Sequence, residues 1–382
     1  MNPATRIAIV HPWFPEYRLA FFTSLIAQAA EQGIHVGVFH GDAPPEWRER
    51  GDSVTAPYAQ KLSTRFFPLA GRSLSHKSLR SLPPREYQGL VLEQAVRNVE
   101  TYGAIARRRP QVALWGHGRT YTQEVSAPQE VAKMWLTRRA DWFFAYTRGG
   151  AEAVEANGFD SRRITIVQNS VDTRQLADDC ARVTQEQLVE TARALDLRGQ
   201  TALFLGGLDA AKRLDFLIES GREVSGHFPD FRLVIAGDGD LRHYIEGMAA
   251  RYRWVKYVGR ATGAAKARLL VSSQVIAMPG RVGLVAVDSF ASGVPIVATD
   301  WQFHAPEYEY LEPDVSALIT PNSPHDYALG LMRVLADSNL LLRLSEGAKG
   351  ASPNYSVERM ANNFVMGLTA WRDVNDREAN GA

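Results

Sequence analysis

Cysteine is almost absent from this sequence of 382 residues. Cys180 is the single cysteine, so no disulfide can form within the chain and no cysteine cluster can hold a metal. A reducing compartment is the simplest interpretation. Uncharged apolar runs of the roughly 18 residues that span a membrane are also absent, and the run at residues 7–10 is too short for a signal-peptide core. We expect a soluble cytoplasmic protein, with peripheral contact at the inner face of a membrane left open.

An excess of charge of either sign is missing as well. The chain has 43 Lys and Arg residues against 42 Asp and Glu residues, a formal net charge of +1. Nucleic-acid binding relies on concentrated positive charge, so we expect no nucleic-acid partner. Hydrophobic residues make up 45% and charged residues 22%, which is typical of a folded globular protein. The length suits two domains of about 150–200 residues.

Two common nucleotide-binding motifs do not occur where they are needed. No Gly-x-Gly-x-x-Gly follows the first apolar run at residues 6–10, which argues against a dinucleotide-dependent oxidoreductase. A Walker-type glycine loop ending in Lys-Ser or Lys-Thr is also absent, which argues against a P-loop kinase. We therefore expect no cofactor.

Short β-branched runs alternate with longer amphipathic patterns along the chain. In the first half, the pattern predicts strands at residues 6–10, 34–40, 112–115, 142–146 and 164–167, and helices at 17–32, 86–109 and 149–157. The alternation restarts later, with strands at 201–205, 231–236, 255–258, 275–278 and 296–299, and helices at 213–225, 241–252, 264–273 and 284–292. Strands separated by helices predict parallel sheets, so we expect an α/β fold of two Rossmann-like lobes facing each other across a cleft.

The restart of the pattern divides the chain into segments. We expect an N-terminal lobe at residues 1–172, a C-terminal lobe at 173–355, and a final helix and tail at 356–382 whose lobe the spacing leaves open. Residues 71–85, rich in Ser, Arg and Lys, are predicted to form a loop of the first lobe. Its positive charges fit either a solvated surface loop or contact with an anionic membrane.

Three glycine turns follow predicted strands of the second lobe. They contain Gly206 and Gly207, Gly237, and Gly280. Glycine lets the backbone approach a ligand closely, and a cation beside a helix N-terminus makes an anion site. Because Lys212, Arg213 and Arg281 lie next to these turns, we predict a phosphate-bearing ligand in this lobe.

The order of these motifs resembles a known family: the retaining GT-B-fold glycosyltransferases of the glycogen-synthase-like type (glycosyltransferase family four, glycosyl transferases group 1). The resemblance covers residues 110–345 and rests on Gly206-Gly-Leu208 with Lys212, Gly237-Asp-Gly-Asp-Leu241, Gly283-Leu-Val285 with Asp288, and Gly293-Val-Pro-Ile-Val-Ala-Thr299. It implies a metal-independent transferase that moves a hexose from a nucleotide-diphosphate sugar, its co-substrate, to an acceptor hydroxyl in glycan, glycolipid or glycoside synthesis. The acceptor, a sugar, a lipid-linked molecule or a small molecule, binds in the first lobe of such enzymes.

The resemblance also implies roles for matching residues. Lys212 neutralises the departing diphosphate, the helix starting at Gly283 points its amides at the same phosphates, and His117 approaches the donor sugar. Lys212 and His117 are the catalytic candidates. The donor-binding candidates are Gly206, Gly207, Lys212, Arg213, Gly237, Arg260, Arg281, Val282, Gly283, Leu284 and Asp288, the last in place of a ribose-binding Glu. The acceptor-side candidates are Glu16, Tyr17 and Arg18.

The sequence departs from the family's pattern in three places. The glycine pair usual near the N-terminus of the first lobe is absent, and the loop there is His11-Pro-Trp-Phe-Pro-Glu-Tyr-Arg18. The other two departures are single positions. Gly280 replaces a Glu that contacts the donor sugar, and Gly207 replaces a phosphate-binding Arg. We expect Gly280 to leave open room, with Arg281 either gripping an acidic or acetamido sugar there or replacing the lost phosphate contact.

The departures keep two alternatives open: a nucleotide-sugar epimerase or hydrolase on the same fold, and a nucleotide-sugar-binding protein that has lost catalysis. Asp238 and Asp240 form an Asp-x-Asp pair, but their strand-to-helix context favours a turn, and we expect no metal.

Overall fold

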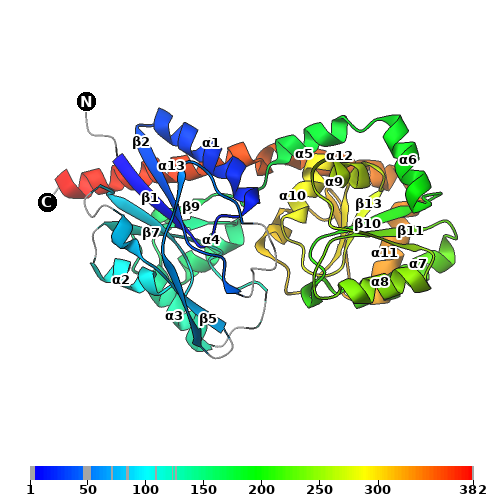
Figure 1. Ribbon diagram of the computed structural model, residues 1–382, viewed down its shortest axis with the longest axis horizontal. Coiled ribbons are helices and arrows are strands. Elements are labelled where there is room, and N and C mark those ends of the chain that lie inside the picture. Colours follow the sequence, from blue (N-terminus) through cyan, green and yellow to red (C-terminus); the bar gives the residue numbers. More distant parts are fainter. Residues whose placement is uncertain are drawn as a thin grey trace. The chain divides into compact units, whose positions relative to one another are not determined.

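The computed structural model describes residues 5–45, 53–69, 72–82, 86–107, 110–122, 124 and 127–380. The chain forms two compact units, each built on a parallel sheet with helices (Figure 1). Unit 1 comprises Met1–Val171 and Val357–Ala382, and unit 2 comprises Asp172–Ser356. The final helix, whose lobe the sequence left open, therefore belongs to unit 1.

The sheet of unit 1 has seven parallel strands in the order β3-β2-β1-β6-β7-β8-β9. The strands are β1 (Thr5–His11), β2 (Ile34–His40), β3 (Ala59–Lys61), β6 (Gly89–Glu93), β7 (Gln111–Gly116), β8 (Trp142–Ala145) and β9 (Ile164–Ile166). Strand order reverses direction between β1 and β6. Open α/β sheets bind ligands at such a reversal, beyond the carboxyl ends of the strands.

Alternating side chains of the strands build a core on each face of this sheet. Ile7 and Ile9 of β1 pack with α1 (Leu19–Glu31) and α13 (Val357–Asn380), which lie side by side (Figure 1). Ala8 and Val10 point to the other face and pack with α2 (Val99–Arg107), α3 (Ala127–Thr137) and α4 (Arg148–Ala156). This period of two is what a strand covered on both faces requires.

Two predictions for unit 1 were wrong. The helix predicted over residues 86–109 is strand β6 followed by α2, because the apolar run Gly89–Glu93 is inserted in the sheet between β1 and β7. The loop predicted over residues 71–85 contains strand β5 (Arg72–Lys77), which pairs antiparallel with β4 (Thr64–Leu69). Residues 71, 83–85 and 108–109 of these two predictions lie outside the described residues.

A buried ion pair attaches β5 to α2. Lys77 Nζ lies 2.7 Å from Glu100 Oε1, and both side chains are 3% exposed. Glu100 Oε2 also accepts a hydrogen bond from the Lys77 backbone N–H at 3.1 Å.

Glu100→Ala is expected to lower the free energy of unfolding by about 3–5 kcal/mol, because it leaves the Lys77 ammonium buried without its partner. Asp42→Ala is the matched control, since it removes the exposed pair with Lys61 and should cost less than about 1 kcal/mol. Urea unfolding of both variants measures the difference. Equal losses would contradict a structural role for the buried pair.

Unit 2 has six parallel strands in the order β12-β11-β10-β13-β14-β15. They are β10 (Thr201–Leu205), β11 (Arg232–Ala236), β12 (Val255–Gly259), β13 (Val275–Met278), β14 (Ile296–Thr299) and β15 (Ala317–Thr320). Every residue of β10, β11, β13 and β14 is buried, as expected of a parallel sheet covered on both faces. The order reverses between β10 and β13, which predicts the ligand position in this unit.

Helices cover both faces of the second sheet. On one face, α7 (Leu214–His227) packs against α11 (Pro324–Ala336), with α8 (Arg242–Arg251) nearby (Figure 1). On the other face lie α5 (Thr173–Ala181), α9 (Gly263–Val271), α10 (Val285–Ser292) and α12 (Ser338–Ala351), with α6 (Gln185–Leu195) packed against α9. The sequence pattern predicted the strands from β10 to β14 but missed β15, α11 and α12.

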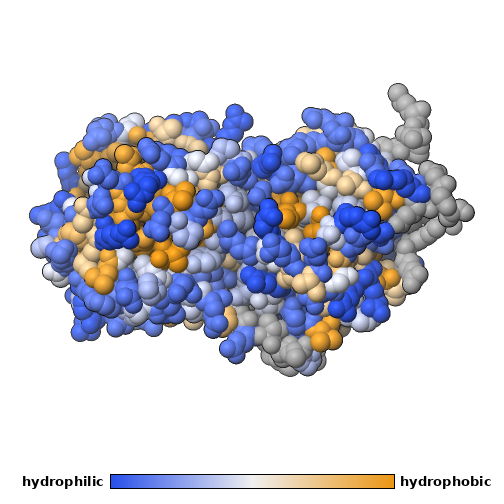
Figure 2. Space-filling model, turned by 180° about the vertical axis from the view of Figure 1, so that it is seen from behind, coloured by the Kyte–Doolittle hydropathy of each residue, from blue (hydrophilic) through white to orange (hydrophobic). Residues whose placement is uncertain are grey.

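The face of the molecule drawn in Figure 2 is mainly hydrophilic, with separate hydrophobic patches. Among the described residues, no helix combines the length and the apolarity that crossing a membrane requires. The cytoplasmic location and the contact with a membrane surface stay predictions.

Candidate functional site

Three glycine turns meet at the carboxyl ends of β10, β11 and β13 in unit 2. A Cβ on Gly237 would lie 1.9 Å from the carbonyl oxygen of Gly206, and a Cβ on Gly280 would lie 2.5 Å from the carbonyl carbon of Lys212. No side chain fits at either position without moving the backbone. Glycine therefore lets the turns converge at the point where the strand order reverses.

The same distances overturn the expectation that Gly280 leaves open room. The backbone of Ala211 and Lys212 fills the space where a side chain at position 280 would begin. Gly280 is closely packed, so a sugar cannot bind in the space beside it. The predicted contact between Arg281 and a sugar in that space is therefore no longer supported.

Lys212 lies at the centre of the converging turns. Its Nζ donates a hydrogen bond to the carbonyl oxygen of Arg281 at 2.6 Å, and it would lie 3.7 Å from a Cβ on Gly206. Burial lowers the pKa of the ammonium to about 8, while the nearby carboxylate of Asp209 acts in the opposite direction. At pH 7 Lys212 is therefore still mainly protonated and can bind an anion.

Arg213 and Arg281, the other two predicted cations, are held differently. Arg213 Nη1 donates to Asn322 Oδ1, and its guanidinium lies 4.2 Å from the Phe216 ring centroid. The Arg281 backbone N–H donates to the carbonyl oxygen of Ala211 at 2.9 Å, which fastens this loop to the turn that carries Lys212. Arg213 is thus engaged by the protein, whereas Arg281 lies directly beside Lys212.

His304, which the sequence analysis missed, supports the loop that leads into α10. The Val282 backbone N–H donates to His304 Nδ1 at 3.0 Å, and His304 Nε2 bonds the Thr299 carbonyl at 2.9 Å. Nε2 must carry the proton to donate to a carbonyl, so the ring is neutral. Burial lowers its pKa to about 4. The helix α10 begins at Val285, two residues later than the predicted start at Gly283. The positive end of its dipole therefore lies at the end of this loop.

Glu307 was also missed by the sequence analysis. Glu307 is 4% exposed. A Cβ added to Gly283 would lie 4.0 Å from Glu307 Oε2. Its charge also raises the pKa of Lys212. The structure thus brings a carboxylate to this site from the turn Pro306–Tyr310, where no sequence motif pointed to one.

Asp288 does not present a free carboxylate. Its Oδ1 lies 2.6 Å from Nζ of Lys266, a residue of α9 that the sequence analysis did not select. Asp288 is 8% exposed. A contact of Asp288 with ribose hydroxyls stays a prediction, and it would have to form beside this ion pair.

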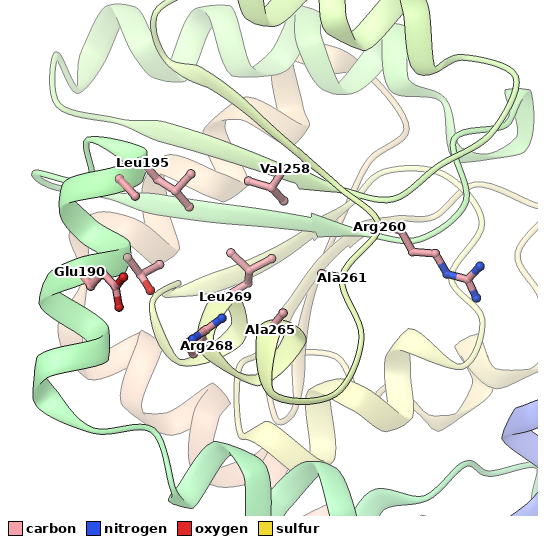
Figure 3. Close-up of a pocket in the computed structure, with 10 residues that line it drawn as sticks. Glu190, Leu195, Val258, Arg260, Ala261, Ala265, Arg268 and Leu269 are labelled. Carbon is pink, nitrogen blue, oxygen red and sulfur yellow. The ribbon is translucent and has the colours of Figure 1, made fainter.

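Arg260 follows Gly259, whose carbonyl accepts a hydrogen bond from the Gly237 backbone N–H at 2.8 Å, and it lines a cavity of about 280 Å³ between α6 and α9. Figure 3 shows its side chain pointing away from Leu195 and Leu269, which line the same cavity. Neither Lys212 nor Arg281 lines this space. A role of Arg260 in donor binding stays a prediction.

Unit 1 has a pocket of about 160 Å³ at the reversal of its own strand order. His11 ends β1 and Glu93 ends β6, and both line it. Three predicted residues, Tyr17, Arg18 and His117, line the same pocket, whereas Glu16 is exposed and does not. The other lining residues are Val10, Pro12, Trp13, Trp115, Tyr146 and Asn169.

His117 lies against an aromatic wall of this pocket. Its ring centroid is 4.6 Å from that of Tyr146. The surrounding protein displaces water and lowers the pKa of the imidazole, and the positive charges of Lys133 and Arg18 act in the same direction. His117 is therefore a neutral imidazole at pH 7, able to exchange hydrogen bonds with a hydroxyl group.

The Asp238 and Asp240 pair lies in a turn, as its context predicted. Asp238 Oδ1 accepts a hydrogen bond from the Gly239 backbone N–H at 3.0 Å and lies 3.9 Å from Arg242 Nη1. Within the part of the chain that the structure describes, no group of three or more His, Cys, Asp or Glu side chains could hold a metal ion.

Residues 199–337 match the family model described as Glycosyl transferases group 1. The matched stretch lies within unit 2. An uncharacterized glycosyltransferase from Methanocaldococcus jannaschii is 29% identical over 172 residues, 43% of each chain. Phosphatidyl-myo-inositol mannosyltransferase from Mycobacterium leprae is 30% identical over 107 residues, 27% of this chain and 29% of that protein. The matched segments thus span less than half the length of these relatives.

The solved structure of HepE from Anabaena in complex with UDP is similar over almost the whole chain. The two structures superpose with a TM-score of 0.68 and are 16% identical in sequence. The superposition covers 96% of this chain and 100% of the HepE chain. The likeness shows the fold, and the chain has the GT-B fold with two Rossmann-like lobes. Because it extends over both units, it reaches beyond the stretch that the family model matches.

Proposed function

We propose that this protein is a glycosyltransferase that takes a sugar from a nucleotide-diphosphate sugar bound in unit 2. The observation that carries the proposal is Lys212, a protonated and half-buried lysine at the strand-order reversal of a Glycosyl transferases group 1 domain. Arg281 and the start of α10 add positive charge beside it. These groups suit a diphosphate, and UDP in the HepE structure is a ligand of that class.

The proposed reaction retains the configuration at the anomeric carbon. The acceptor hydroxyl bonds to this carbon while the bond to the diphosphate oxygen breaks, and the hydroxyl proton passes to the leaving diphosphate. Lys212 stabilises the charge that develops on the leaving group. His117, as a neutral imidazole, contributes hydrogen bonds to a sugar hydroxyl.

Product analysis tests this proposal against its alternatives. The protein is incubated with UDP-, GDP-, ADP- and dTDP-sugars, with and without a panel of acceptor sugars and lipids, and products are examined by mass spectrometry and NMR. Acceptor-dependent release of the nucleoside diphosphate, with a glycoside of retained configuration, is the expected result. Turnover of the same donors without any acceptor product indicates an epimerase or hydrolase, and binding without turnover indicates a protein that has lost catalysis.

Transfer is expected to continue in excess chelator. The diphosphate charge would be neutralised by Lys212 and the helix dipole of α10, which leaves no step that needs a cation. The measurement compares the initial rate in about 10 mM EDTA with the rate in magnesium or manganese. A rate that EDTA abolishes and either metal restores would overturn this part of the proposal.

Nucleoside-diphosphate affinity is expected to fall about twofold between pH 7 and pH 8 and about tenfold between pH 7 and pH 9. The phosphate is bound by the protonated form of Lys212, whose pKa is about 8, so binding weakens as the ammonium loses its proton. Calorimetry across this range measures the fall. Lys212→Arg is the control, because a guanidinium stays charged and should flatten the profile. A similar fall in Lys212→Arg would assign the titration to another group.

A further inference from the structure

Arg18 is a buried cation at the pocket of unit 1. It is 2% exposed and lines the pocket between the ends of β1 and β6. Its side chain donates to Tyr146 Oη at 3.2 Å and to Met360 Sδ at 3.7 Å. Among the described residues, no carboxylate lies within ion-pairing distance of its guanidinium. A buried guanidinium without a counter-charge costs stability, so its position calls for an anionic partner.

Two buried donors of this pocket have no hydrogen-bond partner within the part of the chain that is described. They are Nε of Arg18 and Nε1 of Trp115. Both residues line the pocket, and the guanidinium carbon of Arg18 lies 5.1 Å from the Trp115 ring centroid. Buried N–H groups are normally satisfied by protein, water or a ligand, so these two donors in the wall of the pocket lack the partner that such groups usually have.

Glu93 and His11 are the ionisable side chains of this pocket at the ends of β6 and β1. Glu93 is the one carboxylate among the described lining residues; its Oε2 accepts a hydrogen bond from Asn98, and burial raises its pKa. His11 Nδ1 donates to the carbonyl of Trp13, and burial lowers the pKa of His11 to about 3, so that ring is neutral. Arg18 thus carries the permanent positive charge among the described residues that line the pocket.

We infer that this pocket binds an oxyanion, a carboxylate or a phosphate, carried by the acceptor of the transfer reaction. The inference rests on the proposed function for the identity of the molecule, whereas binding of the anion itself does not depend on it. Arg18 supplies the charge, Trp115 Nε1 supplies a donor, and the cavity of about 160 Å³ has the volume of several water molecules. Its position at the strand-order reversal is where this fold class binds ligands.

A purely structural explanation makes a different prediction. The guanidinium also lies within 5.7 Å of the ring centroids of Tyr17, Phe21 and Tyr146, an arrangement that stabilises a cation by cation–π attraction. If Arg18 serves the fold, Arg18→Met lowers the melting temperature. If it serves a ligand, Arg18→Met keeps or raises the melting temperature and abolishes anion binding.

The experiment is an NMR titration of the whole protein, read at the indole Nε1–H signal of Trp115. Inorganic phosphate and acetate are the probes, glucose is the neutral control, and the signal is identified by its loss in Trp115→Phe. Phosphate, acetate or both should shift the Trp115 signal saturably, and glucose should not. Which anion binds more tightly distinguishes a phosphorylated acceptor from an acidic one.

Variants locate the binding. Arg18→Met should weaken the anion at Trp115 by about tenfold or more without lowering the melting temperature, because a charge-assisted bond is lost. Lys212→Ala should leave this titration unchanged while losing nucleoside-diphosphate affinity, so a failure of the donor site is recognised separately. A Trp115 signal that neither anion moves in the wild-type protein overturns the inference. Anion binding that Arg18→Met retains, or a lowered melting temperature of a folded Arg18→Met, overturns it as well.

Discussion

Lys212→Ala is expected to weaken the binding of the preferred nucleoside diphosphate by roughly 1.5–3 kcal/mol, or about 10- to 150-fold. The ammonium lies over the Gly206 turn and is held by the carbonyl of Arg281, so the variant removes the central charge of the site. Turnover should fall more than affinity, because charge on the leaving diphosphate is greatest in the transition state. Calorimetry and initial rates on the same preparation measure both effects.

A matched control is available in the same unit. Arg251 is exposed and ends α8, whose first residue follows the Gly237 turn, so Arg251→Ala removes one positive charge at the end of the helix opposite that turn. It should change the affinity by less than about 0.5 kcal/mol. An unchanged diphosphate affinity in folded Lys212→Ala, or an equal loss in Arg251→Ala, would show that Lys212 is not the phosphate ligand.

Gly280→Ala is expected to disrupt the donor site although it adds only one methyl group. The new Cβ would lie 2.5 Å from the Lys212 carbonyl carbon and 2.6 Å from the Ala211 carbonyl oxygen, and backbone atoms cannot yield as a flexible side chain can. Overpacking of this kind costs about 1–3 kcal/mol of unfolding free energy. It would also move Lys212, so diphosphate affinity should fall about tenfold or more.

Gly226→Ala serves as the control for this prediction. Gly226 lies in α7, and a Cβ there would meet nothing within 4 Å. Alanine at this position should raise the free energy of unfolding by about 0.4–1 kcal/mol and leave diphosphate affinity unchanged. Urea unfolding and calorimetry of both variants provide the comparison. If Gly280→Ala binds and unfolds like the wild type, the close approach of the two backbones is not required.

The sequence could predict the parts of this molecule that depend on local pattern. Short apolar runs identified β10, β11, β13 and β14, because a parallel sheet covered on both faces requires such runs. Glycine followed by a basic residue pointed to the turns at Gly206 and Gly280, which the structure brings together around Lys212. The roles given to these residues stay predictions.

Other features depend on contacts between distant segments, which spacing does not reveal. The run Gly89–Glu93 was read as part of a helix, and its neighbours β1 and β7 make it a strand. Gly280 was interpreted as open room, because the approach of Ala211 is set by tertiary packing. His304 and Glu307 carry no motif, and only their burial beside Lys212 and Gly283 reveals them.

A crystal structure of the protein with its tightest-binding nucleoside diphosphate tests the central claim most directly. The account predicts the diphosphate in unit 2, with a phosphate oxygen within hydrogen-bonding distance of Lys212 Nζ and near the backbone amides that lead into α10. A diphosphate bound in unit 1, or one in unit 2 at the Arg260 cavity without any contact to Lys212, would contradict it.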